Sequence, residues 1–153
     1  MKIVEIEIPE ETVNLEKSRP PEAMRYDDFV WCVGVVFSFT ARALVVDASL
    51  FGFMKKLFGA LRDIQKTGQP VLLNDENGAY QISLSQEGDM IHLHDTFGNG
   101  SASIRLDPLL KETYAEFIRA TEELETKIPS FLGNEDYNKI KTEIERNIQA
   151  LTP

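Results

Sequence analysis

Two histidines are the residues whose type and spacing could most readily do chemistry. His92 and His94 stand two apart in the segment Met90–Asp95, which alternates like a β-strand, so both side chains point to the same face. Such a pair could supply two ligands to a metal ion if a third arrived from elsewhere. Asp95 points to the opposite face, and no other Cys, Glu or His stands at a supporting short spacing. We therefore expect no metal site and no cofactor, and place both histidines on an outer face.

The remaining motifs do not form a catalytic constellation. The segment Asp95–Gly100 is rich in glycine but lacks the GxxxxGK[ST] pattern of a phosphate loop, so a hairpin turn is the better interpretation. No serine or cysteine lies in a nucleophile-elbow sequence. The single cysteine, Cys32, lies in the apolar run Phe29–Phe39 and is expected to be a buried, inert thiol, which fits a reducing cytoplasm. These observations indicate a binding protein rather than an enzyme.

The overall charge narrows the class of partner. The chain has a formal net charge of −9, which disfavours nucleic acid and anionic membrane surfaces because their phosphates would be repelled. A basic protein partner is the favoured inference, and the alternative is that acidic groups only keep the chain soluble. The N-terminus has no uninterrupted apolar core of a signal peptide, and the run Val30–Phe37 is too short to cross a bilayer. We expect a cytoplasmic protein.

Alternation of apolar and polar residues predicts most of the strands. The strongest strand covers Phe29–Thr40, and a short strand over Arg42–Val46 follows it. Gln86–Asp89 and Phe97–Gly100 have turn composition and separate three further strands. The segment between Pro9 and Phe29 has no period and contains two adjacent prolines, so we expect a loop there. The remaining predicted strands are Lys2–Ile8, Ala79–Ser85, Met90–Asp95 and Ser101–Leu106.

Helical spacing of apolar residues predicts three helices. The first begins at a cap formed by Asp47 or Ser49, and Gly68 closes it. Its buried stripe is Leu50, Met54, Leu57, Phe58, Leu61 and Ile64. The second begins with Asp107 as the cap and Pro108 in the first helical position, and continues to about Lys127. The third is Glu135–Leu151, a helix with a narrow apolar stripe.

These elements predict an α+β fold in the order β-β-α-β-β-β-α-α. We expect one antiparallel sheet of about five or six strands with the two main helices packed on one face. The 153 residues form a single domain, in which 134–153 could be an added helix. That helix would pack on its own chain or join two copies in a dimer, so the chain is expected to be a monomer or such a dimer.

The layout resembles a family of bacterial immunity proteins. The resembling parts are the strand Val30–Phe39, the helix LFGFMKKLFGALRDI, the strands QISLSQEGDMIHLHDTFGNGSASIRLD and the helix YAEFIRATEEL, which together cover about Phe29–Leu124. Asp95 with Gly98, followed by an alternating strand and Asp107, is similar to the pattern of immunity proteins encoded beside polymorphic toxins of the WapI type. The resemblance implies stoichiometric binding that blocks a toxin domain, often a basic nuclease, and it assigns no functional residue.

Three functional hypotheses follow. The first is a non-enzymatic immunity protein that neutralises a basic toxin domain. The second is an acidic secretion chaperone for an effector, which would need an exposed apolar groove. The third is an enzyme or small-ligand protein with a site around His92 and His94. For the first, the expected partner-binding residues are the clustered acids that border the strands or lie on a helix, namely Asp75, Glu76, Glu87, Asp89, Glu122, Glu123 and Glu125.

Overall fold

The computed structural model describes residues 3–18, 33–39, 42–75, 78, 80–98 and 100–151. Within these ranges the chain is an α+β protein, which confirms the predicted class. The predictions for Cys32 and Glu76 concern residues outside the described ranges. The elements in chain order are β1 (Val4–Glu7), α1 (Glu10–Ser18), β2 (Val33–Phe39), β3 (Arg42–Ala48), α2 (Leu50–Thr67), β4 (Val71–Asn74), β5 (Gln81–Glu87), β6 (Met90–Asp95), β7 (Ser101–Arg105), α3 (Leu106–Lys127), the 3₁₀ helix η2 (Pro129–Gly133) and α4 (Glu135–Leu151).

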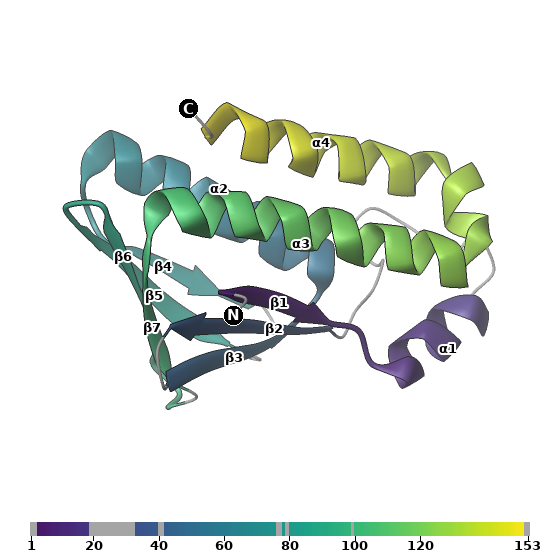
Figure 1. The fold of residues 1–153 in the computed structure, drawn as a ribbon, viewed down its shortest axis with the longest axis horizontal. Coiled ribbons are helices and arrows are strands. Elements are labelled where there is room, and N and C mark those ends of the chain that lie inside the picture. Colours follow the sequence, from purple (N-terminus) through teal and green to yellow (C-terminus); the bar gives the residue numbers. More distant parts are fainter. Residues whose placement is uncertain are drawn as a thin grey trace.

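The strands are antiparallel as predicted, but they form two sheets instead of one. The first sheet has the order β1-β2-β3 and the second has the order β4-β5-β6-β7. Helix α2 separates β3 from β4 in the sequence, and each strand after it pairs with its neighbour along the chain. Strands β6 and β7 lie near β2 and β3 without pairing with them, so the sheets contact each other while their ladders stay separate. Helices α2 and α3 lie over the sheets, and α4 lies beyond these two helices (Figure 1).

Two described elements differ from the expectations. Helix α1 occupies the beginning of the segment predicted to be a loop, and β4 follows Pro70 where no strand was expected. Helix α1 is short and buries only Thr12, Val13 and Glu16, which leaves little helical period to detect. Its start is still physically sound, because the carbonyl of Pro9 accepts the first helical hydrogen bond from Val13. Strand β4 has four residues, too few for an alternation to be recognised.

The ends of α2 agree with the sequence, whereas the start of α3 does not. Ser49 occupies the N-cap of α2, and Gly68 adopts a left-handed conformation with φ 70° and donates its N–H to the carbonyl of Ile64 at 2.8 Å. Helix α3 begins at Leu106, so Asp107 is not its cap. The N–H of Leu106 donates to the carbonyl of Asp89 at 2.8 Å, which lets β7 continue directly into the helix. Pro108 then lies in the first turn, where a missing N–H costs no helical bond.

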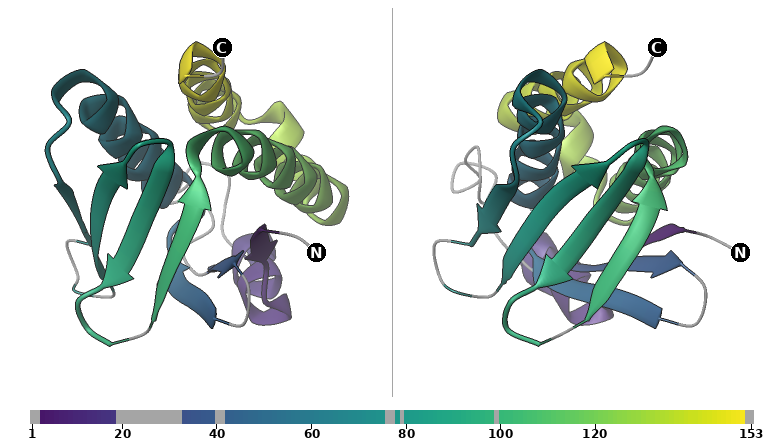
Figure 2. Two further views of the ribbon diagram at one scale, coloured as in Figure 1. Left: turned by 60° about the vertical axis from the view of Figure 1, so that its left-hand side comes forward. Right: turned by 90° about the vertical axis from the view of Figure 1, so that its left-hand side faces the viewer.

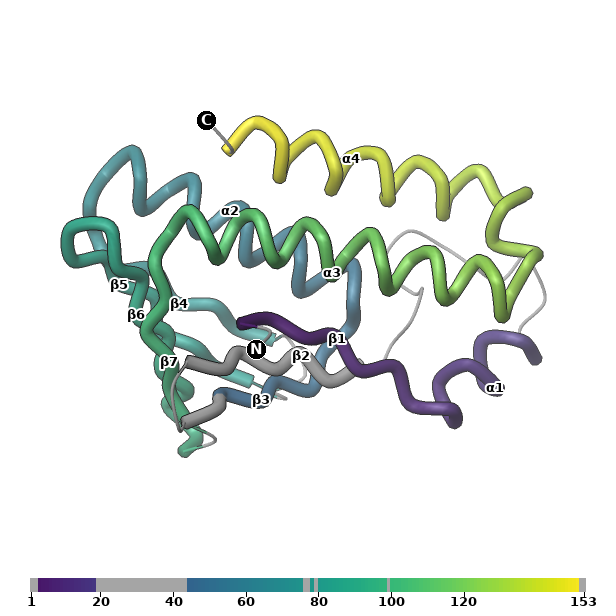
Figure 3. The backbone as a smooth tube through the Cα atoms, viewed as in Figure 1, coloured from purple at the N-terminus to yellow at the C-terminus, as the bar shows by residue number. Residues whose placement is uncertain are grey.

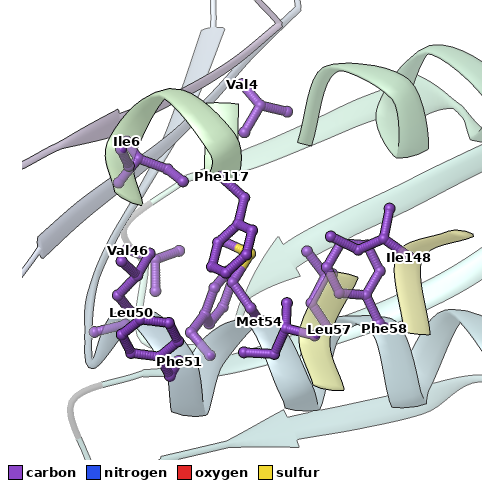
Figure 4. Close-up of a cluster of buried hydrophobic side chains, with 14 of the residues drawn as sticks. Val4, Ile6, Val46, Leu50, Phe51, Met54, Leu57, Phe58, Phe117 and Ile148 are labelled. Atoms are coloured by element: carbon purple, nitrogen blue, oxygen red, sulfur yellow. The ribbon is translucent and has the colours of Figure 1, made fainter. Parts of the chain in front are cut away.

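The last helix packs within its own chain. The apolar stripe of α4 consists of Tyr137, Ile140, Ile144 and Ile148, and all four side chains are buried. Helix α4 contacts both α2 and α3. Figure 4 shows Ile148 beside Leu57 and Phe58 of α2. The stripe considered for a dimer is therefore covered in cis.

Polar side chains of α3 hold the outer edge of β1. The N–H of Ile3 donates to Glu112 Oε2 at 2.8 Å, and Arg119 Nη2 donates to the carbonyl of Ile6 at 2.6 Å. Positions 112 and 119 lie about 10.5 Å apart along a helix, and three residues of a strand span about 10 Å, so the two spacings match. Glu116 holds Arg119 in place, because it accepts Arg119 Nε at 2.7 and 3.1 Å. Figure 3 shows α3 passing over β1.

We predict that shortening either of two fully buried residues in α2 destabilises the protein strongly. Leu57 and Leu61 are both 0% exposed, and a leucine-to-alanine change in a core costs about 2–5 kcal/mol. Urea unfolding of Leu57→Ala and Leu61→Ala should give clearly lower midpoints than the unaltered chain. The control is Arg62→Ala on the exposed side of the same helix, expected within about 0.5 kcal/mol of the unaltered chain. Unaltered midpoints for both leucine variants would show that this face is not in the core.

We also predict that Arg119→Met loosens β1. The change removes the donor to Ile6 and leaves the buried carboxylate of Glu116 without its guanidinium, which should cost about 1.5–3 kcal/mol. Amides of β1 should exchange with solvent faster than those of β5. Lys111→Met is the matched control, since among the described residues Lys111 pairs with Asp107 alone, at an exposed position. Equal stability of the two variants would contradict a tethering role for Arg119.

Candidate functional site

The two histidines lie on an open face of the second sheet. Ile91 and Leu93 are buried on the inner side of β6, whereas His92 is half-buried and His94 is exposed on the outer side. This confirms the orientation expected from the alternation. In the strand register, His94 lies between Ser83 of β5 and Ser101 of β7. His92 lies in the same way between Ser85 of β5 and Ser103 of β7. Figure 2 shows this face of β5, β6 and β7 without a helix over it.

His92 connects a carboxylate and a hydroxyl. Its Nδ1 lies 2.7 Å from Ser103 Oγ, and its Nε2 lies 3.6 Å from Glu87 Oε2. These residue types also occur in hydrolase triads, which additionally need donors for a developing oxyanion. Strand β6 pairs on both sides, so its backbone N–H groups are used in the ladders. Among the described residues no group of three side chains could hold a metal ion, and this cluster is best interpreted as a polar surface network.

The acids at the meander loops have basic or aromatic neighbours. Asp89 Oδ2 lies 3.9 Å from Arg105 Nε, and both side chains are largely exposed. Glu87 faces His92 as described above. Asp75 is half-buried near Tyr80, whose carbonyl accepts the N–H of Asp75 at 3.1 Å. These carboxylates are accessible to a partner, but a partner would have to compete with groups of the chain itself.

The acids predicted on α3 have different environments. Glu122 is exposed. Glu123 lies between Arg119 and Lys127 at 3.8 and 3.7 Å. Glu125 pairs with Lys141 of α4 at 3.0 Å and is only 13% exposed, so it joins the two helices rather than facing solvent. Burial, followed by the charges of Glu125 and Glu145, raises the pKa of Tyr137 beneath this pair.

An open cavity of about 590 Å³ lies where three helix ends meet. Its apolar lining comes from the start of α3 and the end of α4, and Asp89 and Arg105 lie at its side. The lining residues are Gln65, Asp89, Arg105, Leu106, Asp107, Pro108, Leu110, Ala150 and Leu151. The ion pair between Asp89 and Arg105 partly neutralises its charged side, so the cavity presents no strong preference for one charge.

Sequence reasoning missed a further acidic surface, on the outer face of the first sheet. Glu5 and Glu7 are exposed on β1, and Val45 and Asp47 are exposed on β3. The register places Glu7 and Asp47 on either side of Gly34 of β2, about 10 Å apart by the usual strand spacing. In the described part of the structure none of these three carboxylates forms an ion pair. We call Glu5, Glu7 and Asp47 the acidic face.

The signal for the acidic face was only partly present in the sequence. Alternation over Val4–Glu7 already indicated a strand with Glu5 and Glu7 on its wet side. Asp47 was considered as a helix cap, and its position beside Glu7 depends on the pairing of β1 and β3 with β2. Exposed Glu10 and Glu11 at the start of α1 follow the acidic face along the chain. They also interact favourably with the helix dipole.

Comparison with protein-family models, curated proteins and solved structures gives no match. None of the helices in the described ranges has the length and apolar character required to span a membrane. The surfaces described above are therefore the observations from which a function can be inferred.

We predict an unusual titration for the tyrosine beside Asp75. Burial, and then the charge of Asp75, raises the pKa of Tyr80 from 10 to about 12. Folding thus favours the neutral phenol, so this contribution to stability is full below pH 10 and is lost as pH rises through about 12. Ultraviolet titration of the unaltered chain and of Tyr80→Phe should assign the step near pH 12 to Tyr80. Asp75→Asn should move that step towards 10, and a Tyr80 step at 10 in the unaltered chain would contradict the prediction.

Proposed function

We propose that the chain is a non-enzymatic immunity protein that binds a basic bacterial toxin domain and covers its active site. The observation that carries the proposal is the acidic face, where three exposed carboxylates lie together on one sheet and form no ion pair with a described residue. Like charges on a rigid surface repel one another, and a cationic partner removes that cost when it binds. The net charge of −9 adds a long-range attraction for the same kind of partner.

The contrast with the other acids supports this choice. Asp107, Glu123 and Glu125 each lie within 4 Å of a lysine or arginine of the chain, so their charges are already partly compensated. These ion pairs lie on helices α3 and α4. The carboxylates of the acidic face project from a sheet whose other side is core, since Val4, Ile6 and Val46 are buried there. A rigid, uncompensated surface is suited to a partner of opposite charge.

The alternatives receive less support. A secretion chaperone was expected to use an exposed apolar groove and a dimer through the last helix, but the apolar stripe of α4 is buried within the chain. An enzyme around His92 and His94 would need groups that hold and activate a substrate, and the face around them is an ordinary paired sheet. The proposal places the protein in the bacterial cytoplasm, where it would protect the cell that makes the toxin.

The first test is capture of the partner. The tagged chain, purified from the bacterium that encodes it, should carry a basic protein domain in a one-to-one complex. Co-expression of the chain should restore growth of cells that express that domain, and addition of the purified chain should block the domain's activity in solution. Recovery of the chain alone, or with acidic proteins only, would contradict the proposal.

We predict that charge reversal on the acidic face slows binding to that partner. Glu5→Lys, Glu7→Lys and Asp47→Lys combined raise the net charge from −9 to −3, since three carboxylates become three ammonium groups. The association rate should fall roughly tenfold at low salt, because steering by the face is lost. Stability should change little, since all three side chains are exposed.

The matched control reverses Asp75, Glu87 and Asp89 to lysine, which gives the same net charge of −3 at the meander loops. Stopped-flow association of both variants across a range of salt separates position from net charge. A larger loss for the acidic-face variant supports the proposed surface. Equal losses would show that only the total charge matters, and a larger loss for the control would move the surface to the meander loops.

A further inference from the structure

The edges of the two sheets are not equally protected. Glu112 and Arg119 of α3 hydrogen-bond to β1 at its outer edge. Strand β4, one edge of the second sheet, has four residues and lies against α2, from which Lys56 Nζ donates to the carbonyl of Asn74 at 2.7 Å. Strand β7, the other edge, lies near β2 and β3 of the first sheet. Natural proteins protect sheet edges in such ways because unpaired backbone groups can pair with another chain.

Strand β3 lacks this protection. It is the other edge of the first sheet, and each of its seven residues is in register with β2 on one side only. In the described part of the chain no hydrogen bond reaches β3 from outside that ladder. In Figure 1, β3 forms the lower margin of its sheet, and β1 with α3 lies on the opposite margin. Among the described residues, β3 therefore presents a row of backbone donors and acceptors that no other strand pairs with.

The side chains beside this edge define what could pair with it. Val45 is 45% exposed and Asp47 is exposed, and both lie on the outer face of the first sheet. If another strand pairs antiparallel with β3, a β-branched residue opposite Val45 and a lysine or arginine opposite Asp47 would stabilise the pairing. An extended segment meets both conditions when the side chains on one of its faces are alternately basic and apolar.

Charge argues against a second copy of this chain as the occupant. Each copy carries a net charge of −9, and pairing β3 with β3 would bring two acidic faces into one continuous sheet. Carboxylates brought within a Debye length of about 8 Å repel one another even at physiological salt. The same carboxylates attract a basic segment, so charge complementarity selects a partner of opposite sign.

We infer that the free edge of β3 accepts an extended basic segment of the partner as a fourth strand of the first sheet. The inference rests on the proposed function and adds to it the mode of recognition. Main-chain hydrogen bonds to β3 would provide affinity, and the contacts at Val45 and Asp47 would provide specificity.

The test uses a synthetic seven-residue peptide in which lysine and valine alternate at every second position, with threonine at the positions between them. Lysine and valine then lie on the same face of the added strand, as Asp47 and Val45 require. Amide hydrogen exchange of the intact chain is followed by NMR with and without this peptide. The β3 amides that point away from β2 should exchange at least tenfold more slowly at saturating peptide. A control peptide with glutamate in place of each lysine should have no effect. Changes in NMR chemical shift at the acidic face without slower amide exchange in β3 would overturn the inference, because they would indicate attraction by charge alone.

Two matched variants test the position of the site. Val45 and Leu72 are exposed apolar residues on edge strands of the two sheets, 45% and 49% exposed. Val45→Lys should weaken peptide binding at least tenfold, and Leu72→Lys should leave it unchanged, although both add one positive charge. Equal weakening would overturn the inference. If the captured partner depends on the acidic face while the β3 amides in that complex exchange as in the free chain, the inference fails and the proposed function stands.

Discussion

Burial of α2 is the interaction on which the other elements depend. Nine side chains of this helix are buried, and Phe51 in its first turn contacts both later helices. The ring of Phe51 meets Phe117 of α3 edge-on at 5.9 Å and Tyr137 of α4 edge-on at 5.7 Å. Phe53 meets Tyr80, just before β5, in the same manner at 5.4 Å. One helix thus joins both later helices and the second sheet through aromatic contacts that stabilise beyond their buried area.

This arrangement decides which surfaces remain for binding. Because α2 and α3 occupy the space over the sheets and α4 covers the two helices, the helical apolar stripes are used in the core. No helix of the described ranges covers the outer faces of the two sheets, and these faces differ in chemistry. The outer face of β5 to β7 carries serines and histidines, whereas the acidic face carries carboxylates. The electrostatic recognition that we propose is consequently placed on the first sheet.

Local patterns allowed much of this to be predicted, and non-local pairing accounts for what could not. The meander and the stripes of α2 and α4 follow from periods of two and 3.6 residues, which are properties of neighbouring residues. The division into two sheets and the covered edge of β1 depend on residues far apart in the chain, such as Ile6 and Arg119. The role of Glu125 was likewise hidden, because its partner Lys141 lies on another helix.

Because side chains alternate between the core and the surface along β1 and β3, neighbouring residues of these strands are under different constraints. Ile6 is 1% exposed and contributes to the core, while Glu5 and Glu7 on either side of it are exposed. A change at Ile6 alters packing and costs stability, but a change at Glu5 or Glu7 alters only the surface charge. The same holds for Val46 between Val45 and Asp47. The proposed partner surface could therefore change residue by residue while the fold is retained, which is the property that recognition of one partner among many similar ones requires.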